Sequence, residues 1–259
     1  SRGLGDVYKR QEYTQVAMVT ACLAITRAVE SMGLHADMTA GLSLGEYCAI
    51  AVAGGMCDLD AIRTVRSRGI FMEHAAPEGS GAMSAVLGMD AAVIENVLNG
   101  REGVSIANYN CPGQIVITGE AAAVAEAGTA LKEAGARRVL PLKVSGPFHS
   151  PMMRPAGEEL AKVFARVSMN PLKIPYVANI NAEVITDCGR IEGLLVEQVS
   201  GSVRWQQSVE TMIREWVDTF VEIGPGKTLT GFLRKIDKNV KAYHIGSWEE
   251  AVQVCEELK

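Results

Sequence analysis

The sequence lacks long apolar runs, paired cysteines and an excess of positive charge. No uninterrupted apolar stretch reaches the roughly 20 residues that a membrane-spanning helix requires, and no basic start followed by an apolar segment indicates a signal peptide. The six cysteines form no C-x-x-C pair and show no metal-ligand spacing with the four histidines. These absences predict a cytoplasmic protein with reduced thiols, no membrane association and no metal site.

The charge and the composition limit the remaining classes. A formal net charge of -5 argues against broad binding to nucleic acid, which requires positive surface charge. Of the 259 residues, 48% are hydrophobic, which is enough to bury one large core or two modest ones. The chain therefore has the composition of an ordinary globular protein.

Residues 1–11 have a separate interpretation. The segment DVYKRQ at residues 6–11 reverse-translates into a sequence that resembles a transposon end used in sequencing-library preparation. We therefore predict that residues 1–11 are a sequencing-adapter artefact and leave them out of the fold prediction. On this hypothesis the natural chain begins upstream, and its amino-terminal part is missing here.

The segment AGLSLGEYCAI places Ser43 between Gly41 and Gly45 in the spacing G-x-S-x-G. A short strand candidate precedes the serine, and a helix of small apolar residues follows it. A serine nucleophile needs this context, because the flanking glycines relieve a strained turn and the helix directs backbone N–H groups at a developing oxyanion. A glycine turn without catalytic function shows the same short pattern, so both interpretations stay open on these residues alone.

Residues 80–144 alternate between strand and helix patterns in the order β-α-β-β-α-β. The strand candidates are GAMSAVLGM, VSIANYN, QIVITG and RRVLPLKV, and the helix candidates are DAAVIENVLNG and EAAAVAEAGTALKEAGA. This order is that of a ferredoxin-like subdomain. Residues 12–79 and 145–259 mix amphipathic helices with short strands such as KIPYVANI. We predict an α/β protein in which a larger α/β-hydrolase-like domain, formed by these two segments, carries the ferredoxin-like subdomain as an insertion and has a cleft beside it.

Seven segments carry a resemblance to a known family: GLSLGEY, RSRGIFM, PEGSGAM, NYNCPGQIVITG, SGPFHSPMM, VRWQQSVE and EIGPGKTLTGF. In this order and spacing the chain resembles the bacterial malonyl-CoA:acyl-carrier-protein transacylases, over residues 12–233. The resemblance implies an acyltransferase of fatty-acid biosynthesis. Such an enzyme moves the malonyl group from malonyl-CoA to the phosphopantetheine thiol of acyl carrier protein, through a malonyl-serine intermediate in a ping-pong reaction.

The resemblance also implies roles for catalytic residues. Ser43 matches the nucleophile, and His149, in GPFHS, matches the base that takes its proton. Family members hold this histidine through a backbone carbonyl, which aligns with that of Gln198, so no acidic third member is expected. Leu44, the residue after the nucleophile, supplies a backbone N–H to the oxyanion hole.

Three further residues match substrate-binding positions. Arg68, in RSRGIFM, matches the arginine that binds the malonyl carboxylate, whereas Arg63 and Arg66 fit a solvated helix face better. Phe148 resembles the bulky residue of malonyl-selective members, which fills the space that an α-methyl branch would need. Asn110 matches a small-subdomain loop that lines the cleft, although asparagines beside a Pro-Gly turn are more often structural.

Two departures from the family pattern qualify the resemblance. Leu42 stands where histidine is common before the nucleophile, which affects local packing more than chemistry. The loop G-Q-G-S-Q, which donates the second N–H of the oxyanion hole in the family, has no counterpart in this sequence. Because one lost oxyanion donor costs on the order of a hundred- to a thousandfold in rate, we expect this amino-terminally truncated chain to be poorly active.

Two alternatives to a transacylase remain. A serine esterase or thioesterase shares G-x-S-x-G but has no need of Arg68. An inactive remnant that binds acyl carrier protein is the other alternative, suggested by the absent oxyanion loop. The expected partners are acyl carrier protein and malonyl-CoA, with no cofactor and no nucleic acid, and the protein is expected to be a monomer.

Overall fold

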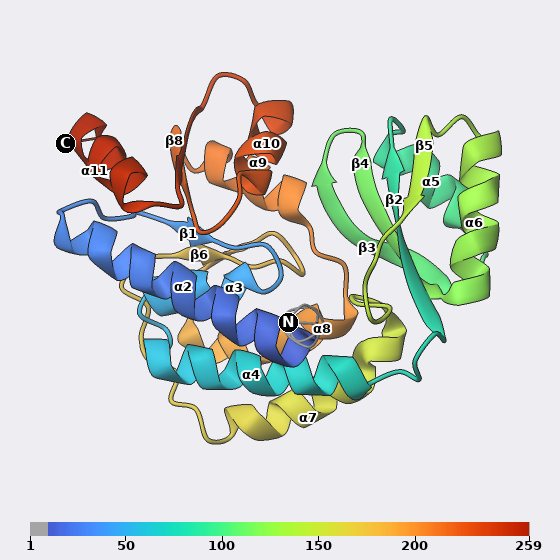
Figure 1. The fold of residues 1–259 in the computed structure, drawn as a ribbon, viewed down its shortest axis with the longest axis horizontal. Helices are drawn as coiled ribbons and strands as arrows, with labels where there is room; N and C mark the ends of the chain where they lie inside the picture. Colours follow the sequence, from blue (N-terminus) through green and yellow to red (C-terminus); the bar gives the residue numbers. More distant parts are fainter. Residues whose placement is uncertain (1–9, 259) are drawn as a thin grey trace, which may run out of the picture.

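The computed structural model describes residues 10–258 and arranges them in a larger and a smaller lobe (Figure 1). In the larger lobe α2 and α4 lie side by side, and α7 packs against both α4 and α8. The helices of this part are α2 (Gln11–Ser31), α3 (Gly45–Val52), α4 (Asp58–His74), α7 (Arg154–Phe164) and α8 (Ile191–Ser200), with short 3-10 turns η1 (Pro151–Met153) and η2 (Cys188–Arg190). The main core lies between them.

Helix α2 presents one apolar face to this core. Val19 and Leu23 are buried in this core four positions apart, on one side of the helix, whereas Val29 packs in a separate cluster with Ile245 and Val254. Arg10 precedes the helix, and the N–H of Gln11 donates to the Glu73 carboxylate on α4 at 3.1 Å. Of the predicted adapter segment, residues 1–9 lie outside the described residues, so that interpretation stays a prediction.

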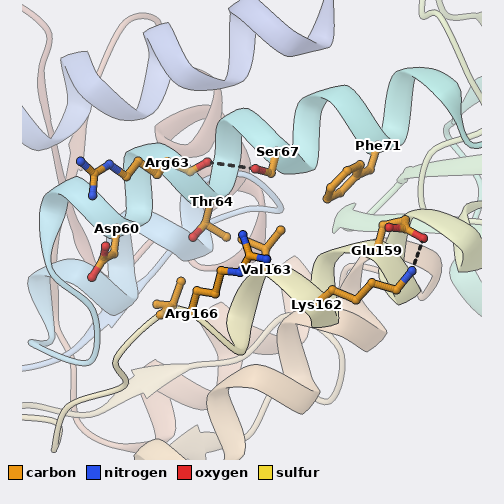
Figure 2. A pocket seen from close by; sticks show the side chains of 10 residues that line it. Asp60, Arg63, Thr64, Ser67, Phe71, Glu159, Lys162, Val163 and Arg166 are labelled. Atoms are coloured by element: carbon orange, nitrogen blue, oxygen red, sulfur yellow. Dashed lines mark hydrogen bonds and ion pairs between the residues drawn. The ribbon is translucent and has the colours of Figure 1, made fainter.

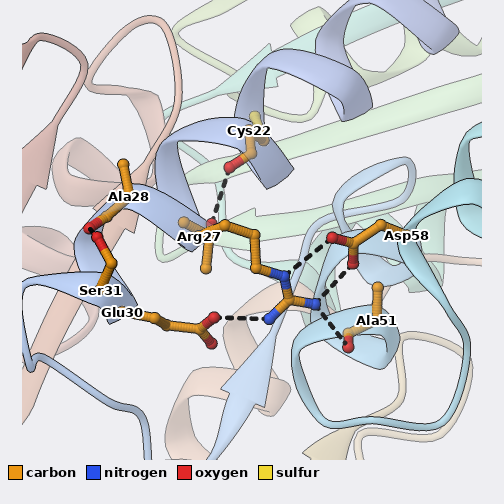
Figure 3. A network of polar contacts seen from close by, with 8 residues as sticks. Cys22, Arg27, Ala28, Glu30, Ser31, Ala51 and Asp58 are labelled. Atoms are coloured by element: carbon orange, nitrogen blue, oxygen red, sulfur yellow. Dashed lines mark hydrogen bonds and ion pairs between the residues drawn. The ribbon is translucent and has the colours of Figure 1, made fainter.

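A half-exposed ion-pair network ties α2 to the start of α4 (Figure 3). The guanidinium of Arg27 donates to both carboxylate oxygens of Asp58, from Nε at 2.9 Å and from Nη2 at 2.6 Å. It also contacts Glu30 at 2.7 Å and the carbonyl of Ala51 at 3.3 Å. The Arg27 guanidinium thus links α2 to the end of α3 and the beginning of α4. These contacts help to hold α3, which follows Ser43, in place.

The strands of the larger lobe are short. β1 (Thr39–Ala40) pairs in parallel with β6 (Tyr176–Val177), and β6 pairs antiparallel with β7 (Val184–Ile185). The longer strand expected at KIPYVANI is therefore wrong in extent. The strand ends early because the chain turns directly after Val177. The N–H of Ala178 donates to the carbonyl of Glu183, and Ala182, within this turn, has a φ of +58°.

The smaller lobe is a four-stranded antiparallel sheet in the spatial order β3-β4-β2-β5. Helices α5 and α6 pack on one face of the sheet (Figure 1). Their shared core is almost fully buried and includes Val86, Ile94, Ile117 and Leu131. In chain order the elements are β2 (Gly81–Leu87), α5 (Ala91–Leu98), β3 (Val104–Cys111), β4 (Gln114–Glu120), α6 (Ala121–Glu133) and β5 (Arg138–Pro141).

The carboxy-terminal part joins the two lobes. Val203, just before α9, exchanges backbone hydrogen bonds with β3 of the small sheet, at 2.8 Å to the carbonyl of Ala107 and 2.9 Å from the N–H of Tyr109. The remaining elements are α9 (Trp205–Arg214), β8 (Thr219–Ile223), α10 (Thr228–Ile236), β9 (Lys241–Ile245) and α11 (Trp248–Glu257). β8 and β9 form a parallel pair.

Candidate active site

Ser43 occupies a sharp turn between β1 and α3. Its φ of +51° lies in the left-handed region, which residues with a side chain rarely adopt. A Cβ added to Gly41 would overlap the backbone carbonyl of Gly45, so the tight turn requires glycine at position 41. This local geometry is that of a serine held in a strained turn at the start of a helix.

His149 faces this serine from the segment before η1. Its Nε2 lies 2.7 Å from Oγ of Ser43, and its Nδ1 lies 2.8 Å from the backbone carbonyl of Gln198 on α8. Because a carbonyl oxygen only accepts, Nδ1 carries the proton and Nε2 is left as the acceptor for the serine hydroxyl. No carboxylate among residues 10–258 contacts the imidazole.

Burial keeps the imidazole of His149 neutral. The ring is almost completely buried, and this burial, together with the positive charge of Arg68, lowers the pKa of His149 to about 4. Hydrogen bonds to backbone carbonyls, that of Gln198 first, oppose the shift. His149 is therefore a free base at neutral pH.

Arg68 on α4 also contacts the hydroxyl of Ser43. Its guanidinium donates to Oγ of Ser43 at 3.0 Å, to Oε1 of Gln198 at 3.1 Å and to Oε1 of Gln15 at 2.7 Å. The residue is only 2% exposed, and burial lowers its pKa. All three acceptors are neutral, and no carboxylate in the described part of the chain pairs with Arg68 directly. A buried cation without an anionic partner, placed on a nucleophile, is suited to a substrate carboxylate.

Leu44 is the cap residue of α3, and its N–H has no acceptor among the described residues. The free N–H at a helix start next to Ser43 is therefore available to a developing oxyanion. This is the position that the sequence assigns to the oxyanion hole.

Phe148 and Asn110 are placed differently. Phe148 directly precedes His149 and packs into the main core with 8% of its surface exposed. Asn110 lies on β3 of the smaller lobe, buried, and makes no hydrogen bond to Ser43, His149 or Arg68. The structure thus brings the catalytic and arginine positions together, while Asn110 stands apart from their hydrogen-bonded cluster.

Three polar residues that the sequence analysis did not name belong to this cluster. Gln15 on α2 binds Arg68, Asn179 accepts from the N–H of Ser43 at 2.5 Å, and Glu46 on α3 contacts both Asn179 and Gln198. Glu46 is the one detectable in advance, because a charged residue in the apolar helix GEYCAIAV is unusual.

Other features of the molecule lie away from this cluster. A cavity of about 400 Å³ lies between α4 and α7, and half of its ten lining residues are charged. Figure 2 shows these side chains. The cavity includes none of the predicted site residues. Residues 10–258 contain no group of His, Cys, Asp and Glu that would hold a metal ion. No helix in the same range combines the length and the apolar character needed to cross a membrane.

Comparison with known proteins decides the family. A sequence model described as an acyl transferase domain matches residues 6–254. The chain belongs to this acyl transferase family. The Malonyl CoA-acyl carrier protein transacylase of Bacillus subtilis (strain 168) is 43% identical to this acyl transferase over 249 residues, which cover 95% of this chain and 78% of that protein. The protein with the same name from Escherichia coli (strain K12) is 44% identical over 239 residues, covering 91% and 77%.

Solved structures agree with this family assignment. The malonyl CoA-acyl carrier protein transacylase from Clostridium perfringens matches this acyl transferase with a TM-score of 0.95 and 38% identity, over 98% of this chain and 81% of that one. A malonyl-transacylase in complex with a type II PKS acyl-carrier protein matches with a TM-score of 0.93 and 37% identity, over 99% and 84%. The mixed α/β fold of this acyl transferase is thus that of solved transacylases.

Proposed function

We propose that this chain is a malonyl-CoA:acyl-carrier-protein transacylase of fatty-acid biosynthesis that carries the malonyl group as an ester on Ser43. The observation that carries the proposal is that the Ser43 hydroxyl contacts both His149 and Arg68. Oγ of Ser43 lies 2.7 Å from the free nitrogen of His149 and 3.0 Å from the unpaired cation of Arg68. The names of the similar proteins support the same substrates.

The first half-reaction acylates the enzyme. His149 Nε2 takes the proton of Ser43 while Oγ attacks the thioester carbonyl of malonyl-CoA. The carbonyl oxygen becomes an oxyanion beside the free N–H of Leu44. As the intermediate collapses, the carbon–sulfur bond breaks, and the protonated His149 gives its proton to the departing thiolate of coenzyme A. Malonyl-Ser43 and a neutral imidazole remain.

The second half-reaction reverses these steps with another thiol. The phosphopantetheine thiol of acyl carrier protein gives its proton to His149 and attacks the ester carbonyl of malonyl-Ser43. The bond from carbon to Oγ then breaks, and His149 returns the proton to Ser43. Gln198 holds the imidazolium in both halves, because its carbonyl accepts from Nδ1 at 2.8 Å. The reaction needs no cofactor beyond the two substrates.

Specificity for a dicarboxylic acyl group is assigned to Arg68. The malonyl carboxylate would take the place of the Ser43 hydroxyl on the guanidinium and bring the anionic partner that the buried cation lacks, while Gln198 keeps its own contact with Arg68. Phe148 would fill the space of an α-methyl branch and favour malonyl over methylmalonyl. Asn110 would line the substrate cleft from the smaller lobe.

The proposal extends to the organisation of the molecule. Residues 80–144 would form a ferredoxin-like subdomain, because the strand order β3-β4-β2-β5 and the two helices on one face fit that motif. Residues 12–79 and 145–259 would form the α/β-hydrolase-like catalytic domain that carries it. Ser43, His149, Arg68 and Gln198 contact one another within one chain, so the reaction would need no second subunit. The protein would be a cytoplasmic monomer.

A hydrolase is the alternative that the same serine permits. An esterase or thioesterase would use an acidic residue on the histidine, and His149 instead donates to a backbone carbonyl. It would also gain nothing from a buried cation at the nucleophile. The contacts of Arg68 and His149 therefore favour the transacylase.

Mass spectrometry of the intact chain, followed over a time course of incubation with malonyl-CoA long enough for a slow acylation, tests the proposal. We expect a mass gain equal to one malonyl group, which Ser43→Ala abolishes. Arg68→Ala should raise the malonyl-CoA concentration needed for half-maximal labelling by about thirtyfold or more, because a buried charged contact is lost.

Arg63→Ala is the matched control, since Arg63 lies on the same helix with an exposed side chain. It should label like the unchanged chain. Labelling that survives Ser43→Ala, or no labelling of the folded chain, would contradict the proposal.

A further inference from the structure

Glu46 is a buried carboxyl one helical turn after the nucleophile. It is the second residue of α3, three positions after Ser43, and only 1% of its surface is exposed. No lysine or arginine among the described residues forms an ion pair with it. Burying an acid without a salt bridge costs free energy unless hydrogen bonds compensate for it. The hydrogen-bond partners of Glu46 therefore indicate why the carboxyl lies here.

Those partners are two hydrogen-bond donors. Nε2 of Gln198 donates to Glu46 at 2.7 Å, and the backbone N–H of Asn179 lies 3.3 Å from both carboxyl oxygens. Burial raises the pKa of Glu46 to about 8, against the hydrogen bonds from Gln198 and Asn179 and the charge of Arg68. Whether charged or neutral, the carboxyl keeps an oxygen that accepts from Gln198.

Both partners hold the strained backbone at Ser43. Nε2 of Gln198 also donates to the carbonyl of Ser43 at 2.8 Å, and Oδ1 of Asn179 accepts from the N–H of Ser43. Nδ2 of Asn179 donates to the carbonyl of Gly41 at 2.8 Å. A residue at φ +51° persists only when its surroundings fix it, and these bonds do so from both sides.

The side-chain amide of Gln198 also faces the guanidinium of Arg68. An amide presents either its oxygen or its NH2 in a given direction, and only the oxygen is compatible with a guanidinium. Glu46 and the Ser43 carbonyl both accept, so together they hold the NH2 and turn Oε1 toward Arg68, 3.1 Å away. Glu46 thus influences Arg68 indirectly, because it fixes which end of the Gln198 amide faces the guanidinium.

We propose that Glu46 is a positioning residue for acyl transfer, which orients the Gln198 amide so that Arg68 and Ser43 keep the geometry that selects a dicarboxylic acyl group. The inference rests on the proposed function. The Glu46 carboxyl bonds to Gln198 and Asn179, and not to Ser43 Oγ, His149 or Arg68. Its effect should therefore appear in the preference between acyl groups and not only in overall rate.

The test measures Ser43 labelling by malonyl-CoA and by acetyl-CoA, which lacks the carboxylate, in the full chain and its variants. Glu46→Leu should lower the malonyl-to-acetyl ratio of labelling efficiencies by about tenfold, because a misoriented Gln198 loses its hydrogen bond to the charged guanidinium of Arg68. Glu46→Gln retains an acceptor for Gln198 and should keep the ratio within about threefold of the unchanged chain.

Glu222→Gln is the matched control, because Glu222 is a partly buried carboxylate that accepts from Leu229 and Thr230 at the start of α10, away from Ser43. It should leave the ratio unchanged. If Glu46→Leu does not fold, Glu46→Asp serves instead, since its shorter side chain withdraws from Gln198 and should also lower the ratio.

Three results would overturn the inference. An unchanged ratio in Glu46→Leu or, in its place, Glu46→Asp means that the acid has no positioning role. A ratio lowered equally by Glu222→Gln means that the effect is a general loss of stability. If the unchanged chain takes no label from malonyl-CoA, the proposed function fails first and the inference falls with it.

Discussion

Ser43 and His149 both have positive φ, at +51° and +60°. Such backbone geometry costs of order 1–3 kcal/mol for each residue and persists where surrounding contacts enforce it. Here the enforcing contacts come from Asn179 and Gln198, which bond the backbone of Ser43 or the ring of His149. At the residue scale, therefore, the serine and its base are held in position before any substrate arrives.

The neutral state of His149 leads to a prediction for pH dependence. Its neutral form is the base, and that form is lost only as the pH falls through the lowered pKa of about 4. The efficiency of Ser43 acylation, kcat/KM, should thus stay level from neutral pH down to about pH 5 and fall below it. An ordinary histidine would give the fall near pH 6.5.

Rapid-quench labelling with malonyl-CoA over a pH series measures this profile. Arg68→Gln provides a second curve, because removing the cation takes away one of the two causes of the low pKa. The fall should then move to higher pH. A fall near pH 6.5 in the unchanged chain would contradict the assigned burial of His149.

The residues that sequence reasoning missed share a physical feature. Gln15, Glu46 and Asn179 reach the site through hydrogen bonds across 53 to 152 positions of the chain. No local periodicity reports such contacts, although the charge of Glu46 in an apolar helix is unusual in itself. Ser43, in contrast, stands in a short pattern whose first glycine has a steric reason. Gln198 was assigned through a resemblance, and only the fold displays the bonds made by its side chain.

At the scale of elements, the turn from β1 to α3 decides where the nucleophile stands. The sequence pattern assigns the relief of the strained turn to both flanking glycines, and the structure limits this need to one of them. A Cβ on Gly41 would overlap Gly45, whereas a Cβ on Gly45 would meet nothing within 4 Å. The first glycine is thus required by the turn and the second is not.

The two glycines form a matched pair of variants. Gly41→Ala should displace the turn, abolish Ser43 labelling and lower the melting temperature. Gly45→Ala should label like the unchanged chain and be more stable by about 0.5–1 kcal/mol, because alanine favours the helix that begins at position 45. Thermal unfolding and intact-mass labelling of both variants check this. Equal behaviour of the two would show that the turn is misassigned.

Elements with strong local patterns were predictable and the others were not. Strands β2 and β4 and helices α5 and α6 follow alternating or helical spacing in their own sequences, and they lie where those patterns put them. The KIPYVANI strand is shortened to Tyr176–Val177 by a turn that depends on Ala182. Helix α8, which carries Gln198, is an exception: its buried positions Ile191, Leu194, Leu195 and Val199 have helical spacing, yet the sequence analysis does not name it.

At the scale of the whole molecule, the site is assembled from separate parts of the larger lobe. Ser43 comes from the turn before α3, Arg68 from α4, His149 from the segment that follows the small lobe, and Gln198 from α8. The small lobe lies between Arg68 and His149 in the chain. Its position relative to the larger lobe is set partly by the bonds of Val203 to β3.

The central claim is transfer to a thiol and not to water. The most direct measurement isolates the malonyl-labelled chain, adds acyl carrier protein bearing its phosphopantetheine arm, and follows both proteins by intact mass. A carrier protein without the arm serves as the control. We predict that the malonyl mass leaves Ser43 and appears on the armed carrier far faster than it is lost with the control. Loss of malonate at the same rate with either carrier would contradict the account and indicate a hydrolase.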